Sequence, residues 1–253
     1  MKFSDLDKTM RQYEEALDIN IIPNLPIVVR LDGRGFSTLT KDLKFKKPFD
    51  NNFKTYMIEV VKTLMKDVGF NFVYGYTQSD EISLLLHRED NTFNRKLRKL
   101  NSILASEASS QMSLILNQRA TFDCRVIQLP NLELIQDYFS WRQEDAHRNS
   151  INAYTFWTLV DEGNTPRKAT SLLNKTSKRT KLEILNNRGV DFNSTPTWHR
   201  RGIGIYYDEV LKEGFNPITK ETTMVVRKKL IVDEELYYNH AYRDFIGSLW
   251  IDN

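Results

Sequence analysis

Three acidic residues have the types and positions needed to bind divalent metal ions. Asp32 follows the apolar run at residues 27–31, and Asp80 and Glu81 follow a second β-favouring run. Convergent carboxylates supply the hard oxygen ligands that Mg²⁺ prefers, and two such ions about 3.5–4 Å apart can activate an attacking hydroxyl and hold a leaving pyrophosphate. The alternative is that Asp32 caps a turn and that Asp80 and Glu81 are solvated bend residues.

The residues that follow Asp32 form a glycine-rich turn that could hold phosphate groups. Residues 32–37 read Asp-Gly-Arg-Gly-Phe-Ser. Small residues allow a close approach of the backbone, and successive N–H groups can form an anion-binding nest. The segment is not a Walker A sequence, because no Gly-Lys-Ser/Thr follows, and its glycine spacing differs from the dinucleotide-binding fingerprint. Two glycines in a turn could equally be structural.

The elements around these residues predict a sheet that brings the acids together. Four β-favouring runs alternate with two helical patterns, in the order 27–31, helix 53–65, 72–76, 82–86, helix 97–116 and 122–129. This β-α-β-β-α-β order is typical of the ferredoxin-like α+β arrangement, a four-stranded antiparallel sheet with two helices on one face. Its first and third strands are neighbours, so Asp32, Asp80 and Glu81 should converge. Polymerase palms and many RNA-binding domains share this arrangement, so the order alone does not decide function.

The second half of the chain is expected to add helices and a small sheet to this core. Helical patterns dominate from about residue 132 to 185, and β-like segments follow at 202–207 and 224–232. No repeat, low-complexity tract or Gly/Ser-rich linker divides the chain. We therefore expect one elaborated domain over residues 1–253, with a catalytic core to about 130 and a helical and β extension from about 131 to 253.

The composition is that of a globular protein. The 253 residues are 40% hydrophobic and 27% charged, which excludes disordered and collagen-like classes. No apolar run approaches the ~18 residues needed to cross a bilayer, and the amino-terminal residues lack the pattern of a signal peptide. The single cysteine, Cys124, cannot form an intramolecular disulfide or a multi-thiolate zinc site. We expect a cytoplasmic protein without membrane contact.

Positive charge is concentrated locally although the formal net charge is only +3. Residues 166–181 contain no acid, and other basic clusters lie at 44–47, 95–99, 199–201 and 227–229. Any one cluster could be a solvated face. Several together favour a polyanionic partner such as RNA, because phosphate contacts release counterions.

Several ordered segments resemble the tRNA-histidine guanylyltransferase family, nucleotidyltransferases that extend RNA in the 3′-to-5′ direction. The segments are Arg30–Phe36, Lys47–Asp50, Gln78–Glu81, Phe122–Val126 and Trp141–His147. The resemblance covers residues 30–160 and continues more weakly to 207. It implies a polymerase-palm core, two Mg²⁺ ions, and GTP, ATP and other nucleoside triphosphates as substrates with tRNA. It also implies a homotetramer built as a dimer of dimers.

The resemblance assigns roles to residues at matching positions. Asp32 and Asp80, with the Gly33 carbonyl, would ligate the metal ions, and Glu81 would support this catalytic group. Nucleotide phosphates would contact the backbone of the first turn and the second acidic motif, through Asp32, Gly33, Arg34, Gly35, Phe36, Ser37, Lys47, Ser79 and Asp80. A further group, assigned to tRNA or its 5′ phosphate, consists of His147, Asn149, Lys175, Lys178, Arg179 and Lys181.

One segment departs from the eukaryotic pattern of the family. The pattern His-Ile-Asn-Asn-Leu-Tyr-Asn is replaced here by His-Arg-Asn-Ser-Ile-Asn-Ala at residues 147–153. This resembles the guanylyltransferase-like branch of bacteria and archaea, which repairs 5′-truncated tRNA. The leading hypothesis is therefore a template-dependent 3′-5′ nucleotidyltransferase acting on truncated tRNA by a two-metal-ion mechanism.

Two alternatives remain open from the sequence. The first is guanylyl transfer restricted to histidine tRNA. The second is a non-catalytic RNA-binding module, although such modules usually read bases with exposed sheet aromatics and need no convergent acids. Asp123, Arg125, Trp141 and Arg142 could be functional or could support the fold.

Overall fold

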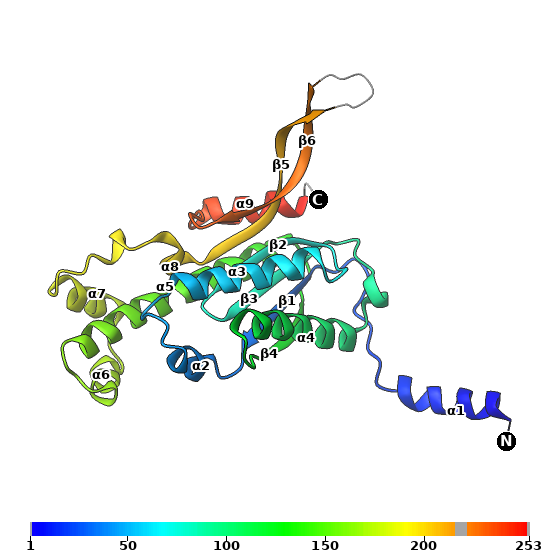
Figure 1. Ribbon diagram of the computed structural model, residues 1–253, viewed down its shortest axis with the longest axis horizontal. Coiled ribbons are helices and arrows are strands. Elements are labelled where there is room, and N and C mark those ends of the chain that lie inside the picture. Colours follow the sequence, from blue (N-terminus) through cyan, green and yellow to red (C-terminus); the bar gives the residue numbers. More distant parts are fainter. Residues whose placement is uncertain (1, 216–221, 252–253) are drawn as a thin grey trace.

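A computed structural model describes residues 2–215 and 222–251 of the chain, which form one antiparallel sheet with helices on both faces (Figure 1). The strand order is β4-β1-β3-β2-β5-β6, and every neighbouring pair is antiparallel. The strands are β1 (Ile27–Gly33), β2 (Phe72–Gln78), β3 (Glu81–Leu86), β4 (Phe122–Gln128), β5 (Ile203–Phe215) and β6 (Thr222–Asp233). The expected mixture of helices with an antiparallel sheet is confirmed.

Helices connect and cover these strands. They are α1 (Phe3–Glu15), α2 (Phe36–Asp42), α3 (Asn51–Lys66), α4 (Leu97–Leu116), α5 (Leu132–Asp161), α6 (Pro166–Leu173), α7 (Lys178–Asn186), α8 (Thr197–Arg201) and α9 (His240–Ile251), with 3₁₀ turns η1 (Thr92–Arg95) and η2 (Phe192–Ser194). Among the described helices, none is long and apolar enough to cross a membrane.

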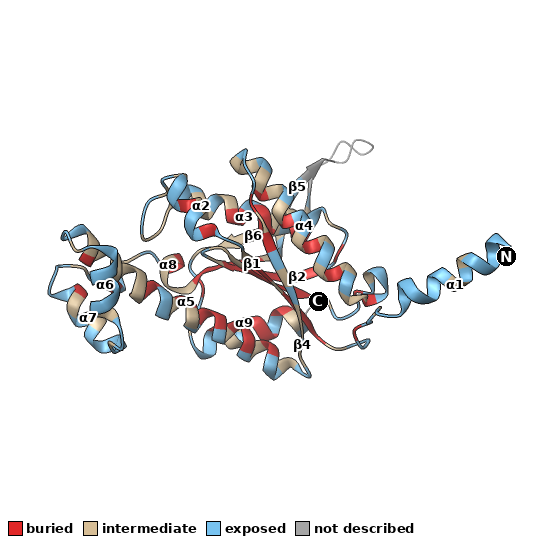
Figure 2. Cartoon of the chain, turned by 90° about the horizontal axis from the view of Figure 1, so that it is seen from below, coloured by how far each residue is buried: buried red, intermediate tan, exposed pale blue. Residues whose placement is uncertain are grey.

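The sheet is buried on both faces. Figure 2 shows α3 and α4 on one face and α5 with α9 on the other, with buried residues along the strands between them. In β1, Val29 and Leu31 belong to the core with α3 and α4, whereas Val28 packs with residues of α5 and α9, including Phe139. Alternate residues of a strand point to opposite faces, so a strand buried on both sides reads as a continuous apolar run.

The carboxyl-terminal strands form the expected β extension as two further strands of the main sheet. Strand β5 pairs with β2, from Tyr74 opposite Tyr206 to Thr77 opposite Ile203, and β6 pairs with β5. Both strands therefore extend the main sheet and cover the hydrogen-bonding edge that β2 would otherwise expose. Their outer halves project from the body as a hairpin (Figure 1).

Strand β2 and helix α3 approach closely at Gly75. A Cβ atom at this position would lie 2.7 Å from Cγ1 of Val61 and 3.0 Å from the sulfur of Met65. Only glycine leaves room for this contact without displacing the helix, because well-packed interiors contain few voids.

The first prediction tests this contact. Gly75→Ala is expected to lower the free energy of unfolding by about 1–3 kcal/mol, the usual cost of overpacking a core. In a Val61→Ala background the loss should be smaller, because the clashing methyl group is gone. Urea denaturation of the two single variants and the double variant measures this coupling. Equal losses from Gly75→Ala in both backgrounds would contradict the proposed clash.

Candidate active site

The register of the sheet places acidic residues beside one another at the end of β1. Asp32 lies directly opposite Glu81 of β3 and, on its other side, opposite Asp123 of β4. Directly opposed residues of antiparallel strands point to the same face, with Cβ atoms about 4.5–5.5 Å apart. Asp32 and Glu81 therefore share the face of the sheet that α5 covers.

Asp80 reaches the same place from the turn between β2 and β3. Gln78 pairs with Glu81, so Ser79 and Asp80 form a two-residue turn, and Ser79 has a positive φ of 54°. The N–H of Gly33 donates to the carbonyl oxygen of Asp80 at 3.1 Å, which ties the turn to the end of β1. Asp32, Asp80 and Glu81 line one cavity of about 290 Å³, here called the acidic cavity.

Gly33 and Gly35 of the first turn must be glycine for different structural reasons. A Cβ on Gly33 would lie 2.5 Å from the ring of Phe36 and 2.9 Å from Cβ of Asp80, so only glycine allows this packing. Gly35 begins α2 with φ of +75°, a conformation that side chains rarely adopt. Phe36 is only 2% exposed and belongs to the hydrophobic core. Arg34 and Ser37 are exposed.

Glu81 is held by arginines. Nη1 of Arg142 donates to both carboxylate oxygens, at 3.0 and 2.8 Å, and Nε of Arg30 lies 3.8 Å from Oε2. Arg142, whose side chain is only 6% exposed, also lies 3.4 Å from Asp145. This network joins the start of β3 to α5, so Glu81 positions the turn that carries Asp80.

The carboxyl group of Asp80 has a perturbed pKa. Burial raises its pKa, and repulsion from Asp32 and Glu81 raises it further, whereas a 3.0 Å hydrogen bond from the Ser79 hydroxyl opposes the shift. Buried neighbouring acids of this kind are frequent at functional sites. The arrangement therefore lacks, in the protein itself, enough positive charge to balance its carboxylates.

The donor set fits Mg²⁺ that is shared with a substrate. Among residues 2–215 and 222–251, no three His, Cys, Asp or Glu side chains form a ready metal-binding group. Asp32 and Asp80 line the acidic cavity with carboxylate oxygens, and Gly33 follows Asp32 directly in the chain. Mg²⁺ is usually bound by one or two carboxylates together with waters and substrate phosphates, so an all-protein cage is not required.

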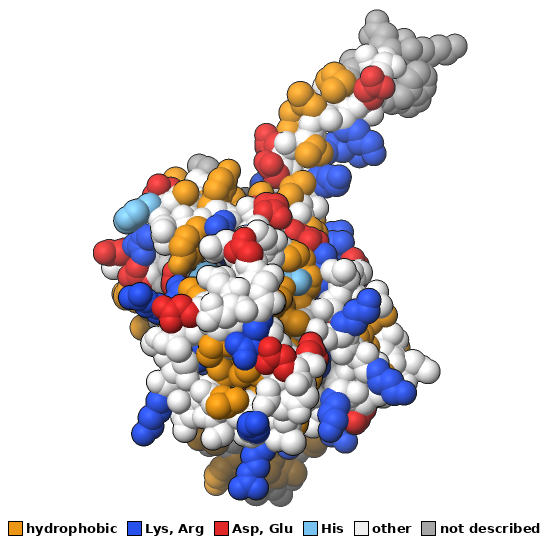
Figure 3. All heavy atoms as spheres, turned by 90° about the vertical axis from the view of Figure 1, so that its left-hand side faces the viewer, with side chains coloured by type: hydrophobic (Ala, Val, Ile, Leu, Met, Phe, Trp, Pro, Cys, Tyr) orange, Lys and Arg blue, Asp and Glu red, His pale blue; other side chains and the backbone are white. Residues whose placement is uncertain are grey.

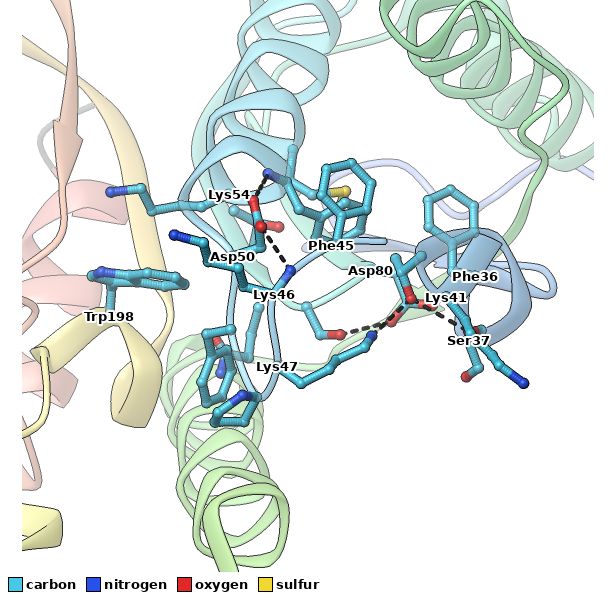
Figure 4. Close-up of a pocket in the computed structure, with 18 of the residues that line it drawn as sticks. Phe36, Ser37, Lys41, Phe45, Lys46, Lys47, Asp50, Lys54, Asp80 and Trp198 are labelled. Atoms are coloured by element: carbon cyan, nitrogen blue, oxygen red, sulfur yellow. Dashed lines mark hydrogen bonds between the residues drawn. The ribbon is translucent and has the colours of Figure 1, made fainter. Parts of the chain in front are cut away.

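A second cavity opens on the other side of the Ser79–Asp80 turn. It encloses about 370 Å³ and is here called the aromatic cavity. Its lining includes aromatic side chains and lysines: Phe45, Phe49, Trp157, Trp198, Lys46, Lys47 and Lys54. Lys47 extends toward Asp80 and Ser37 (Figure 4) and donates to the Thr40 hydroxyl at 2.9 Å. Aromatic surface beside ammonium groups is suited to a nucleobase joined to phosphates.

Asp50 shapes the loop that carries Lys47. Its carboxylate caps α3 by accepting the N–H groups of Asn52 at 2.7 Å and Phe53 at 3.1 Å, and it accepts the N–H of Lys46 at 2.8 Å. Burial raises its pKa, but these three hydrogen bonds outweigh that effect and leave the pKa lowered. The loop is therefore fixed at both ends by one ionised side chain.

The residues assigned to tRNA are placed in different parts of the structure. Asn149 lines the acidic cavity, whereas His147 packs against Phe192 and Tyr238, with ring centroids 5.4 and 6.0 Å apart. Burial, with the nearby charge of Lys178, lowers the pKa of His147.

The basic residues of α6 and α7 lie farther along α5. Lys181 donates to Asn152 at 2.7 Å and lines an open cavity of about 660 Å³ with Arg167, here called the basic cavity. Ala153 lines both the basic and the acidic cavity. Lys175, Lys178 and Arg179 are exposed at this end of the molecule, where basic side chains are spread over the surface in Figure 3.

Sequence reasoning missed most of the aromatic cavity. Trp157 lies on α5 and Trp198 on α8, far in sequence from Phe49. His199 stacks on Phe49, with centroids 4.4 Å apart, and its carbonyl accepts the side-chain amide of Gln78 at 3.0 Å. Isolated aromatic residues carry no spacing signal, so only the tertiary structure brings them to the acids.

Comparison with known families decides the identity of this arrangement. A profile described as tRNAHis guanylyltransferase matches residues 7–130, and a second, described as Thg1 C terminal domain, matches residues 133–242. The chain belongs to the tRNA-His guanylyltransferase family. Members of this family are nucleotidyltransferases, and the chain is an enzyme of that class.

Individual relatives agree with this assignment. A probable tRNA(His) guanylyltransferase of Drosophila melanogaster is 34% identical over 195 residues, covering 73% of this chain and 68% of the relative. The tRNA(His) guanylyltransferase of Saccharomyces cerevisiae is 32% identical over 206 residues, covering 76% and 86%.

Solved structures of the tRNA-His guanylyltransferase family have the same fold. A bacterial tRNA(His) guanylyltransferase-like protein in complex with ATP superimposes with a TM-score of 0.74 at 27% identity, covering 97% of this chain and 99% of the other. The enzyme of Saccharomyces cerevisiae superimposes with a TM-score of 0.72 at 28% identity, covering 89% and 96%. The bacterial protein has also been solved in complex with GTP.

The second prediction concerns the cost of ionising Asp80. Asp80→Asn is expected to increase the free energy of unfolding at neutral pH in the presence of a chelator. The folded-state pKa lies above the unfolded-state pKa, so ionised Asp80 destabilises the fold. At a pH below the folded-state and unfolded-state pKa values, Asp80 is protonated in both states and this cost is absent. The cost grows as the pH rises from the unfolded-state pKa to the folded-state pKa, and it is constant at higher pH.

Urea denaturation of wild type and variant over a pH series measures this difference. Asp123→Asn is the matched control, because Asp123 flanks Asp32 in the same register but is exposed. Its effect on stability at neutral pH should be smaller. An Asp80→Asn variant that is no more stable than wild type at neutral pH would contradict the account.

Proposed function

We propose that this protein is a template-dependent 3′-5′ nucleotidyltransferase that adds nucleotides to the 5′ end of truncated tRNA. The observation that carries the proposal is the position of Asp32 and Asp80 beside a turn that separates two cavities. Gln78, Ser79 and Asp80 line both the aromatic and the acidic cavity. A reaction that joins two nucleotides needs two such sites that meet at the metal-binding acids.

The incoming nucleoside triphosphate would occupy the aromatic cavity. Phe49 and Trp198 would contact the base, and Lys47 would neutralise phosphate charge close to Asp80. The backbone from Gly33 to Ser37 would donate to phosphate oxygens, since its glycines permit close approach. The related bacterial protein solved with ATP and with GTP supports both nucleotides as substrates.

Asp32, Asp80 and the Gly33 carbonyl would hold two Mg²⁺ ions together with the triphosphate. Such ions activate an attacking hydroxyl and stabilise a leaving pyrophosphate. The protein's own part is to fix the ligands: Arg142 holds Glu81, and the Gly33 amide holds the turn that carries Asp80. In the reaction, the 3′-hydroxyl of the incoming nucleotide attacks the 5′ phosphate of the activated tRNA, and pyrophosphate or a nucleotide leaves.

The tRNA end would approach from the α5 side. Asn149 lines the acidic cavity, and the adjoining basic cavity offers Lys181 and Arg167 to the activated 5′ phosphates. Lys175, Lys178 and Arg179, on the exposed surface beyond this cavity, would contact the RNA backbone, and the half-buried His147 would support that surface.

We also propose a homotetramer, a dimer of dimers, in which two subunits span one tRNA.

The sheet order supports a polymerase-palm interpretation of the core. Strands β1–β4 follow the order β4-β1-β3-β2, with α3 and α4 on one face, and the acids lie at one end of β1 and in the β2–β3 turn. We propose that residues to about 130 form this palm and that residues from about 131 to 253 extend the same domain.

The direct test uses tRNA that lacks its first paired nucleotide and carries a 5′-triphosphate. With Mg²⁺ and all four nucleoside triphosphates, the product should grow at its 5′ end and stop at full length. Changing the opposite nucleotide should change the nucleotide that is added. Growth that ignores the opposite nucleotide would contradict templated addition.

Guanosine addition to histidine tRNA is the second candidate activity. Curated relatives that are 30–34% identical carry the name tRNA(His) guanylyltransferase. If the enzyme adds one guanosine to intact histidine tRNA and leaves truncated tRNAs unchanged, the narrower activity replaces our main proposal.

The third prediction tests the roles of the acids. Asp32→Ala and Asp80→Ala should each reduce turnover by at least about a thousandfold, because each removes a ligand that the reaction requires. Asp123→Ala should retain activity within about threefold, because Asp123 is exposed and is not among the lining residues of either cavity. Single-turnover rates on truncated tRNA measure these effects, with circular dichroism as the check of folding. Activity retained in both Asp32→Ala and Asp80→Ala would exclude the two-metal mechanism, whereas a wild-type protein without Mg²⁺-dependent nucleotide binding would favour a non-catalytic RNA-binding module.

A further inference from the structure

Trp141 is an exposed aromatic residue that neither the fold nor the proposed chemistry explains. Its side chain lies on α5, and the residue is 54% exposed. The guanidinium carbon of Arg142 lies 3.7 Å from the centre of its ring, so one face of the indole is covered by a cation. Tyr138 contacts it edge-on, with centroids 5.9 Å apart. The remaining surface of the indole is open to solvent.

The position of Trp141 links it to the acids. Arg142, which stacks on the indole, donates to Glu81, and Glu81 lies opposite Asp32 in the sheet. The indole is therefore linked to Asp32 through two intervening residues, Arg142 and Glu81. Asp32 also points to the face that α5 covers, because Val28, four residues earlier on β1, packs against Phe139 of α5.

RNA would approach the acids from the side on which Trp141 lies. The aromatic cavity, assigned to the incoming nucleotide, is lined mainly by α2, α3 and the loop between them, with Trp157 of α5 and Trp198 of α8, and Trp141 is not among its lining residues. Exposed arginines lie on the two elements that border the acids here: Arg125 of β4 is 54% exposed and lies 3.9 Å from Asp123, and Arg148 of α5 is 71% exposed and pairs with Asp145. An exposed aromatic ring on the helix that also carries Arg142 and Arg148 suits a base and its phosphates better than an apolar protein surface.

We infer that Trp141 is a stacking platform for the unpaired template base at the end of the tRNA acceptor stem. The inference rests on the proposed function and adds a positioning residue to the same site. The base would stack on the open face of the indole. Arg142 covers the opposite face, where its cation–π interaction holds the indole in place. Stacking there would fix the template base next to the acids at which the new bond forms.

A fluorescent base in the tRNA tests this inference without requiring catalysis. The probe is tRNA that lacks its first paired nucleotide and carries 2-aminopurine at the unpaired template position, titrated with full-length protein in the absence of nucleoside triphosphate. Stacking on an aromatic ring quenches 2-aminopurine. Wild type should quench the probe on binding, and Trp141→Phe should retain part of the quenching.

Trp141→Ala should remove the quenching and weaken tRNA binding about 5- to 150-fold, the loss typical of one base–aromatic stack. The dissociation constant for ATP should stay within twofold of wild type. The slope of tRNA affinity against salt should also be unchanged, because no phosphate contact is lost. Leu114→Ala is the control: Leu114 is 75% exposed on α4, which covers the opposite face of the sheet, and its removal should change none of these values.

The outcomes separate the inference from the proposed function. Unchanged quenching and affinity in Trp141→Ala, or no quenching in wild type, would overturn the stacking platform. Loss of ATP binding in Trp141→Ala without a change in quenching would also overturn it, because the indole would then only support Arg142. Quenching that depends on Trp141 in a protein that adds no nucleotide would keep the platform and reject the proposed activity.

Discussion

The pairing of β1 with β3 is the constraint on which the rest of the site depends. Because side chains alternate along a strand, a shift of one residue in this register would turn Asp32 away from Glu81 and from the α5 face. The register is held by apolar side chains on both faces of the sheet, Val29 on one and Val28 on the other. The amide of Gly33 then fixes the turn that carries Asp80. The core therefore determines where the acids lie.

This arrangement places several negatively charged carboxylates close together. The fold tolerates their repulsion because ion-pair and hydrogen-bond partners hold the carboxylates in place. Arg142 neutralises Glu81 and joins it to α5, whereas Asp80 accepts a hydrogen bond from the neutral hydroxyl of Ser79. The acids thus lie between a cavity with aromatic rings and lysines and a cavity bordered by α5. Divalent metal ions would supply the positive charge between these carboxylates and the substrate phosphates, and such uncompensated charge is common where activity competes with stability.

Local patterns in the sequence predicted much of the core, because they depend on neighbours along the chain. The apolar run of β1, the helical spacing of α3 and α4, and the acids in the β2–β3 turn all follow from such patterns. Other features depend on tertiary contacts and were not predicted: α1 and α9, the pairing of β5 with β2, and the aromatic cavity built from three distant segments. The sequence also grouped His147 with Asn149, which lie two residues apart, but the helix turns their side chains to different surroundings.

The central claim is that Asp32 and Asp80 bind metal ions jointly with a nucleoside triphosphate. Crystals grown with Mn²⁺ and a non-hydrolysable ATP analogue test it most directly, because anomalous scattering locates the metal ions independently of the protein model. The account predicts two anomalous peaks that contact both carboxylates and the triphosphate, with Lys47 on the phosphates and the base in the aromatic cavity. A triphosphate bound elsewhere, or metal ions that contact neither Asp32 nor Asp80, would contradict it.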